Sequence, residues 1–200
     1  RGASDQSRLR VLDGLGEGDV THTEISVLDQ IGQLLVYPRA DYVNRMTLCR
    51  SAFPPDAVEA DSLLESYVRQ IQSLPLEKVQ ELYTHTFELN PVCALEVGWQ
   101  LYGEEYARGE FLVAMQAQLR GHSIPQSPEL PDHLSNVLPL LDRMEPDEAR
   151  NFTEVVLLPA LNKMLAGFGE QDNPYRNLLL AISKLLLSNP AECLAEAPRV

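Results

Sequence analysis

Apolar residues recur every three or four positions in one segment after another, and prolines separate these segments along the chain. The clearest segment carries a single apolar stripe made of Leu63, Leu64, Tyr67, Val68, Ile71 and Leu74. A period of 3.6 residues places such side chains on one face of an α-helix. No segment alternates polar and apolar residues between hairpin turns, as a half-buried strand would. The pattern therefore predicts an all-α fold.

The number of such segments predicts about eight or nine helices in a compact single-domain bundle. The first helix should begin at a capping box, Thr21–Glu24, because Thr21 and Glu24 can satisfy each other's backbone N–H groups. Asp41 can cap the second helix, and its inward side chains are expected to be Val43, Met46 and Phe53.

Later segments continue the pattern. Val79, Leu82, Tyr83 and Phe87 form a fourth stripe, which Asn90-Pro91 ends. A short helix at 95–102 and a long one at 106–122 follow, and helix resumes at 132–143 after a proline-rich loop. Pro159 falls inside a helical pattern that starts near Pro146 and should kink it. The last helix should start with Asn173 as cap and Pro174 in the first turn, with apolar residues Leu178, Leu179, Ile182, Leu185 and Leu186.

The two ends of the chain differ from this pattern. Residues 1–20 are polar and include four glycines, so we expect a flexible leader. Residues 21–188 should form the helical domain, and residues 189–200 a weakly ordered tail. A chain of 200 residues is long enough for one domain with a real core.

The charge balance restricts the class of partner. Sixteen basic against 29 acidic residues give a formal net charge of −13. A nucleic-acid-binding protein needs a basic face that releases counterions, so we expect no nucleic-acid partner. The acidic charge either solvates the surface or attracts a basic partner peptide.

The cysteines and hydropathy point to the compartment. Cys49, Cys93 and Cys193 are too few and too far apart for a zinc knuckle or a CxxC redox pair. Such a sparse, odd set suits a reducing compartment. No apolar run approaches the length of a membrane span, and the start lacks the apolar core of a signal peptide. We therefore expect a cytoplasmic protein without direct membrane insertion.

Sequence motifs for catalysis are missing. The chain has no glycine-rich phosphate loop, no HExxH and no GxSxG elbow. Its four histidines have no Cys or Glu partner at metal-ligand spacing. We expect no enzymatic activity, no metal and no cofactor. A hydrolase or nucleotide-dependent enzyme is the contrary hypothesis, and a pocket with clustered, perturbed carboxylates would mark it. No such pocket is expected.

Three segments stand out. Tyr83 and Phe87 lie four residues apart within 81–91, and are either core aromatics or the lining of a groove for an apolar peptide side chain. Arg108 sits near a helix start, where the helix dipole does not favour a cation, so a carboxylate or carbonyl partner is expected. The neighbouring Gly109 can allow another backbone to approach closely. For each of these segments, a purely structural role remains open.

The third segment is Glu129-Leu130-Pro131-Asp132-His133-Leu134, at the end of the proline-rich loop. Asp132 can be the N-cap of the following helix, with His133 half exposed. At the mouth of a groove, the same two residues could instead hydrogen-bond a bound peptide. His133 could also titrate near neutral pH and make peptide release pH-sensitive.

In this order, five segments resemble the molybdoenzyme assembly chaperones of the TorD, DmsD and NarJ family. The resemblance spans about residues 24–187 and is closest to the NarJ branch, the assembly chaperones of respiratory nitrate reductase. The matching strings are Leu34-Leu35-Val36-Tyr37-Pro38, Tyr83-Thr84-His85-Thr86-Phe87-Glu88-Leu89, Arg108-Gly109-Glu110, Glu129-Leu130-Pro131-Asp132-His133-Leu134 and Asn173-Pro174-Tyr175.

The resemblance implies a non-catalytic chaperone. It would bind the N-terminal peptide of an apo molybdoenzyme catalytic subunit, as an unfolded-protein binder in nitrate reductase maturation. It would promote insertion of the molybdenum cofactor before membrane docking or export. Molybdenum cofactor biosynthesis proteins are further possible partners, and the chain would be a monomer or homodimer. A generic helical interaction adaptor is the alternative.

The expected peptide-binding residues come from the three segments singled out above and from the short helix at 95–102, which holds Trp99. Aromatic side chains would line an apolar groove, polar ones would contact the peptide or support the groove, and two further residues would be structural. The aromatic set is Tyr83, Phe87, Trp99 and Tyr106; the polar set is Arg108, Asp132 and His133; the structural pair is Gly109 and Pro131.

Overall fold

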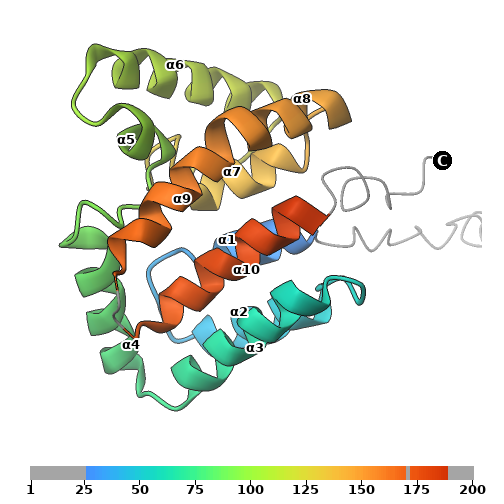
Figure 1. Cartoon of the computed structure of the whole chain (residues 1–200), viewed down its shortest axis with the longest axis vertical. Helices are drawn as coiled ribbons and strands as arrows, with labels where there is room; N and C mark the ends of the chain where they lie inside the picture. Colours follow the sequence, from blue (N-terminus) through green and yellow to red (C-terminus); the bar gives the residue numbers. More distant parts are fainter. Residues whose placement is uncertain (1–25, 170–171, 189–200) are drawn as a thin grey trace, which may run out of the picture.

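The computed structural model describes residues 26–169 and 172–188. In this part of the chain there are ten α-helices, two π-helical segments and no β-strand (Figure 1). Helices α8 and α9 are joined by the π-helix η3 into one continuous helix. Counted this way, the described residues form nine helices. The all-α prediction and the expected number of helices are confirmed. The predicted leader, the capping box at Thr21–Glu24 and the tail lie outside the described residues.

The helices follow one another with short connections. Their bounds are α1 (Val27–Gln33), α2 (Tyr42–Ser51), α3 (Val58–Gln72), α4 (Leu76–Tyr83), η2 (Thr84–Glu88), α5 (Val97–Tyr102), α6 (Tyr106–Gly121), α7 (Leu134–Leu141), α8 (Pro146–Phe152), η3 (Thr153–Leu157), α9 (Leu158–Gly167) and α10 (Pro174–Ser188).

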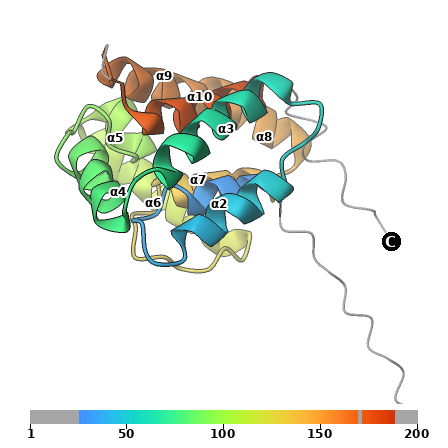
Figure 2. The same cartoon turned by 90° about the horizontal axis from the view of Figure 1, so that it is seen from below.

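Helix α10 lies between α3 and α9. It packs along α3 on one side and against α9 on the other, while α1 packs on α7 and α2 (Figures 1 and 2). Helix α5 lies between α6 and α9. The expected apolar face of α10 is fully used, because its five predicted residues are all buried.

The core differs from the expected stripes at α2. Tyr42, Met46 and Cys49 are buried there, whereas Val43 is 56% exposed and Phe53 only partly buried. The prediction that Val43 faces inward is wrong. Tyr42 faces inward because its hydroxyl has two partners: it donates to the Leu34 carbonyl at 2.7 Å and contacts the Tyr67 hydroxyl.

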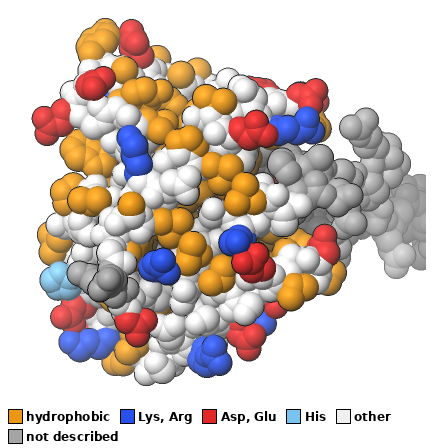
Figure 3. All heavy atoms as spheres, viewed as in Figure 1, with side chains coloured by type: hydrophobic (Ala, Val, Ile, Leu, Met, Phe, Trp, Pro, Cys, Tyr) orange, Lys and Arg blue, Asp and Glu red, His pale blue; other side chains and the backbone are white. Residues whose placement is uncertain are grey.

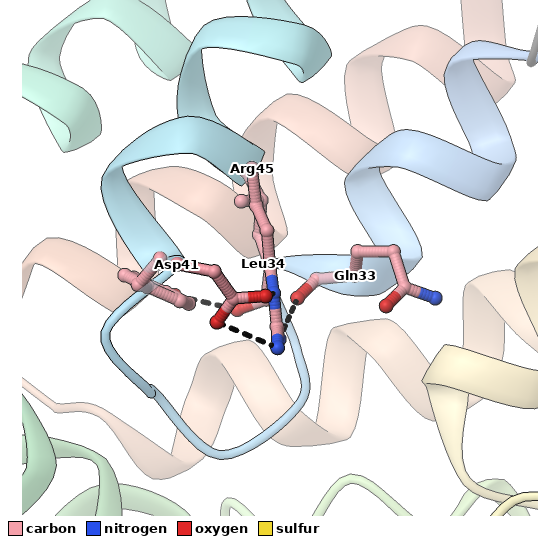
Figure 4. A network of polar contacts seen from close by, with 5 residues as sticks. Gln33, Leu34, Asp41 and Arg45 are labelled. Atoms are coloured by element: carbon pink, nitrogen blue, oxygen red, sulfur yellow. Dashed lines mark hydrogen bonds and ion pairs between the residues drawn. The ribbon is translucent and has the colours of Figure 1, made fainter.

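The link between α1 and α2 is held by Arg45. Its guanidinium donates to both carboxylate oxygens of Asp41, at 2.9 and 3.0 Å, and to the Gln33 carbonyl at 3.3 Å (Figure 4). Asp41 occupies the N-cap position of α2 as expected, but its carboxylate binds Arg45 instead of a backbone N–H. The segment 34–38 is therefore closed into a fixed loop.

The start of α10 follows its prediction. The Asn173 side chain accepts from the Tyr175 backbone N–H at 3.0 Å, which is the expected cap. The same side chain donates to the Thr86 hydroxyl at 2.8 Å and so ties α10 to η2.

A π-helical segment, η3, directly precedes α9, the helix in which Pro159 was expected to cause a kink. Because proline has no N–H, it cannot donate to the carbonyl four residues earlier. Segment η3 ends at Leu157, two residues before Pro159, and α9 starts directly after η3, at Leu158. The backbone thus accommodates the proline with a wider turn.

The surface carries scattered charges. On the face shown in Figure 3, acidic and basic side chains surround and interrupt broad areas of hydrophobic side chains. Cys49 and Cys93 are buried thiols, and burial raises the pKa of Cys49 to about 12. None of the helices in the described residues has both the length and the apolar character needed to cross a membrane.

Candidate functional site

A pocket of about 390 Å³ opens where η2, the loop before α5, the start of α6 and the loop before α7 meet. These segments are up to about fifty residues apart along the chain. Aromatic, acidic and small apolar side chains line the pocket, together with one arginine and one histidine. The lining residues are Tyr83, Phe87, Glu88, Pro91, Ala94, Leu95, Glu96, Trp99, Arg108, Glu129 and His133.

The aromatic wall is anchored to the core. The Tyr83 hydroxyl donates to the Leu35 carbonyl at 2.9 Å, which fixes the ring to the segment 34–38. Its ring meets Tyr37 edge-on at 5.6 Å and Phe87 at 5.2 Å between centroids. Phe87 in turn packs edge-on against Tyr175 at 4.9 Å. Tyr83 and Phe87 are therefore core aromatics, and both rings also border the pocket.

Segment η2 sets the direction of Phe87 and Glu88. Helix α4 continues directly into this π-helical turn, which adds one residue to the turn and rotates the side chains that follow. The Thr86 hydroxyl donates to the Leu82 carbonyl at 2.7 Å and accepts from Asn173. Such π-helical turns occur frequently at functional sites.

Asp132 joins two walls of the pocket. Its carboxylate accepts from the backbone N–H of Gly98 at 2.8 Å, and its carbonyl accepts from the Val97 N–H at 2.9 Å. Asp132 therefore caps α5, and the prediction that it caps the helix following it is wrong. A Cβ on Gly98 would lie 2.8 Å from both the Asp132 carboxylate and the Phe111 ring.

His133 is the residue that caps α7. Its Nδ1 accepts from the Ser135 N–H at 3.2 Å and lies 2.8 Å from the Ser135 hydroxyl. Its backbone forms an isolated antiparallel bridge with Glu96. Pro131 supports this arrangement, because it occupies the second position of a turn in which the His133 N–H donates to the Leu130 carbonyl at 3.0 Å.

These contacts determine the protonation of His133. Because Nδ1 accepts a backbone hydrogen bond, the neutral ring carries its proton on Nε2. His133 is only 3% exposed, not half exposed, and burial lowers its pKa to about 4. The prediction that it titrates near neutral pH is wrong. At neutral pH it supplies a neutral N–H donor.

Arg108 makes neither of the expected contacts, to a carboxylate or to a carbonyl, among the described residues. No carboxylate oxygen lies within 4 Å of its guanidinium in the described part of the chain. Its guanidinium carbon lies 5.2 Å from the centroid of the Trp99 ring, a cation–π distance. Trp99 is held in place because its indole N–H donates to the Pro91 carbonyl at 2.7 Å.

The carboxylates of this region are perturbed. Burial raises the pKa of Glu96, and the neighbouring Asp132 and Glu129 add to this effect. Burial and the charge of Glu88 raise the pKa of Glu129. Burial likewise raises the pKa of Asp132. The expectation that no pocket would hold clustered, perturbed carboxylates is therefore wrong. No group of three potential ligands in residues 26–169 and 172–188 is placed to hold a metal ion.

The pocket brings five of the seven predicted peptide-binding residues together: Tyr83, Phe87, Trp99, Arg108 and His133. The other two lie elsewhere. Tyr106 is 85% exposed at the first turn of α6 and does not line the pocket. Asp132 is fully buried, so it supports the pocket without facing it. Gly109 has open space beside it, and the predicted close approach at that residue is wrong.

The sequence reasoning missed the acidic part of the site. Glu88 and Glu129 belong to the segments singled out above, but neither was expected to be a site residue, and Glu96 lies outside all three segments. Nothing in their spacing distinguishes them from the other acidic residues among 29. They become a group only because the helices bring them to one pocket.

Comparisons with known proteins do not identify a family. No protein-family model matches this chain, and no curated protein is found to be similar to it.

Proposed function

We propose that this chain is a non-catalytic assembly chaperone of the NarJ type. It binds the N-terminal segment of the apo catalytic subunit of a molybdoenzyme such as nitrate reductase. While bound, it keeps that subunit competent for insertion of the molybdenum cofactor and delays membrane docking or export.

The observation that carries this proposal is the meeting of distant segments at one pocket. The string 34–38 holds Tyr83 through the Leu35 carbonyl, and 83–89 forms one wall. Arg108 and the string 129–134 form other walls, while Asn173 binds Thr86 behind the aromatic wall. All five segments on which the resemblance rests thus build or support the same site.

The surroundings of the pocket suit a protein segment as ligand. Leu89, Val92 and Leu130 each follow a lining residue in the chain, and they are 66, 56 and 45% exposed. Exposed apolar residues beside a pocket favour contact with the apolar face of an amphipathic helix. The net charge of −13 favours a basic segment.

The lining favours binding over covalent catalysis by a hydroxyl or thiol. No Ser, Thr, Cys or Lys side chain is among the described lining residues. The Tyr83 hydroxyl is already bound to the Leu35 carbonyl, and burial raises its pKa. His133 uses Nδ1 to cap its own helix, so this nitrogen is not available as a base.

The test is a titration of the full chain with a synthetic peptide of the N-terminal segment of a nitrate reductase catalytic subunit. Trp99 is the only tryptophan and lines the pocket, so a tryptophan-free peptide should change its fluorescence. Calorimetry measures the same binding independently, and Trp99→Phe should remove the optical signal while calorimetry reports how much the Trp99 ring contributes to binding. No heat and no fluorescence change with peptides from several such subunits would contradict the proposal and favour the helical adaptor.

A further inference from the structure

The pocket holds an excess of negative charge. Among the described residues, three glutamates, Glu88, Glu96 and Glu129, line it together with a single cation, Arg108. His133 is neutral at pH 7 because burial lowers its pKa to about 4. None of the three carboxylates forms an ion pair with a Lys or Arg in the described residues. With the glutamates ionised, the lining carries two uncompensated negative charges, which attract a cation.

Arg108 is a weakly held occupant of this pocket. Its guanidinium lies over the Trp99 ring, a position that any basic side chain can take. Its Nε is buried and has no hydrogen-bond partner within the described residues. A buried donor without a partner loses the hydrogen bond that water would supply. Moving Arg108 outward would therefore restore a hydrogen bond to that nitrogen.

His133 supplies a second, independent sign of a ligand. The side chain lines the pocket while being 97% buried by exposed area, since only 3% remains accessible. Both of its hydrogen bonds in the described structure use Nδ1. Its Nε2–H is thus a donor without a partner among the described residues. A backbone carbonyl of a bound segment would satisfy this donor.

We propose that the pocket takes one lysine or arginine side chain of the bound segment, and that Arg108 competes with this side chain. The incoming cation faces Glu88, Glu96 and Glu129, and its apolar stem lies against the aromatic wall. The His133 Nε2–H donates to a carbonyl of the same segment. Arg108 then regulates affinity, because it must leave the Trp99 face before the guest cation fills it. This inference rests on the peptide binding proposed above.

The test uses the full chain and two forms of the peptide from the nitrate reductase catalytic subunit. One form keeps its lysines and arginines, and the other has glutamine in their place. Calorimetry compares the wild type with Glu129→Gln, Arg108→Gln and Glu65→Gln, each of which changes the net charge by one. The measurements are made at roughly 50 and 300 mM salt, below and above the physiological ionic strength, because salt screens the attraction between charges. Glu65 is exposed on α3, outside the pocket, so Glu65→Gln is the control for the change in net charge that Glu129→Gln makes.

The expected effects have opposite signs. Glu129→Gln should weaken binding of the basic peptide by about threefold or more, and Arg108→Gln should strengthen it by about the same factor. Glu65→Gln should change it by less, and no variant should alter binding of the neutral peptide in this way.

Three outcomes would overturn the inference. Equal affinities of wild type for the basic and neutral peptides would overturn the cationic guest while leaving the proposed chaperone function in place. Weaker binding of the basic peptide by Arg108→Gln would show Arg108 to be a contact and not a competitor. Binding of neither peptide would overturn the inference together with the proposed function. Circular dichroism of each variant confirms that the comparison is between folded proteins.

Discussion

The carboxylate of Asp132 accepts a hydrogen bond from the backbone N–H of Gly98 at 2.8 Å, so a residue of one loop caps a helix formed by another part of the chain. Gly98 is next to Trp99, and Asp132 is next to His133. A single hydrogen bond thus fixes the relative position of Trp99 and His133, two pocket residues that are 34 positions apart in the chain. The buried Asp132 belongs to the support of the pocket, and its sequence neighbour faces the ligand space.

Gly98→Ala should destabilise the fold by about 1–3 kcal/mol, because the new methyl group overpacks a filled site. That methyl would lie 2.8 Å from the Asp132 carboxylate and from the Phe111 ring. Gly109→Ala is the matched control, since nothing lies within 4 Å of its Cβ position. In a helix interior this change should stabilise by about 0.5–1 kcal/mol. Urea unfolding measures both, and equal effects would refute the packing account.

Tyr83→Phe should reduce the free energy of unfolding by about 1–2 kcal/mol, because the buried Leu35 carbonyl loses its hydroxyl donor. The ring contacts with Tyr37 and Phe87 remain in this variant. Tyr37→Phe is the control, since no hydrogen bond of its hydroxyl is present in the described structure. Thermal unfolding of both variants tests the difference. A Tyr83→Phe protein as stable as Tyr37→Phe would contradict the importance of the Leu35 anchor.

The His133 ring should stay neutral from pH 8 down to about 5, with the proton on Nε2. Its folded pKa of about 4 lies below the unfolded value. Above the unfolded pKa of ~6.5 the ring is neutral in both states, so His133 does not lower the free energy of unfolding. As the pH falls from ~6.5 towards 4, only the unfolded state takes up the proton, and the free energy of unfolding decreases. Nitrogen-15 NMR of the imidazole reads both the tautomer and the titration. A midpoint near 6.5 would show that the ring is not buried as described.

Glu129→Gln should raise the free energy of unfolding at pH 7. The folded pKa of Glu129 is raised by burial and by Glu88, so its ionised form destabilises the fold above that pKa. The penalty disappears as the pH falls through the folded pKa towards the unfolded value of ~4.3. Denaturant unfolding at pH 7 and pH 4 should therefore show an advantage of the variant that shrinks on acidification. An advantage that grows towards pH 4 would refute this sign.

Much of the fold was predictable because it depends on local pattern. The stripe of α10 and its Asn173 cap were predicted correctly, since apolar periodicity and a capping side chain act within one helix. Val43 was predicted wrongly for a tertiary reason. The neighbouring Tyr42 turns inward to reach the Leu34 carbonyl, and this leaves Val43 on the outside.

The residues of the candidate site also divide into those that local sequence predicts and those that only the tertiary structure reveals. Tyr83, Phe87 and His133 could be predicted, because they belong to segments whose residue types are unusual together, and Trp99 stands out as the only tryptophan. Asp132 was expected to cap its own helix, the local choice, and instead caps α5. Glu96 could not be predicted, because its burial and raised pKa come from neighbours in other segments.

By itself, the sequence determined an all-α chain of about nine helices and where most of them start, because hydrogen bonds within a helix join residues that are close in the chain. Only the tertiary structure decided which of 29 acidic side chains share a pocket, that Arg108 lies over Trp99, and that His133 is a neutral donor. These properties depend on burial and on charges from distant segments, and both arise only when the helices pack.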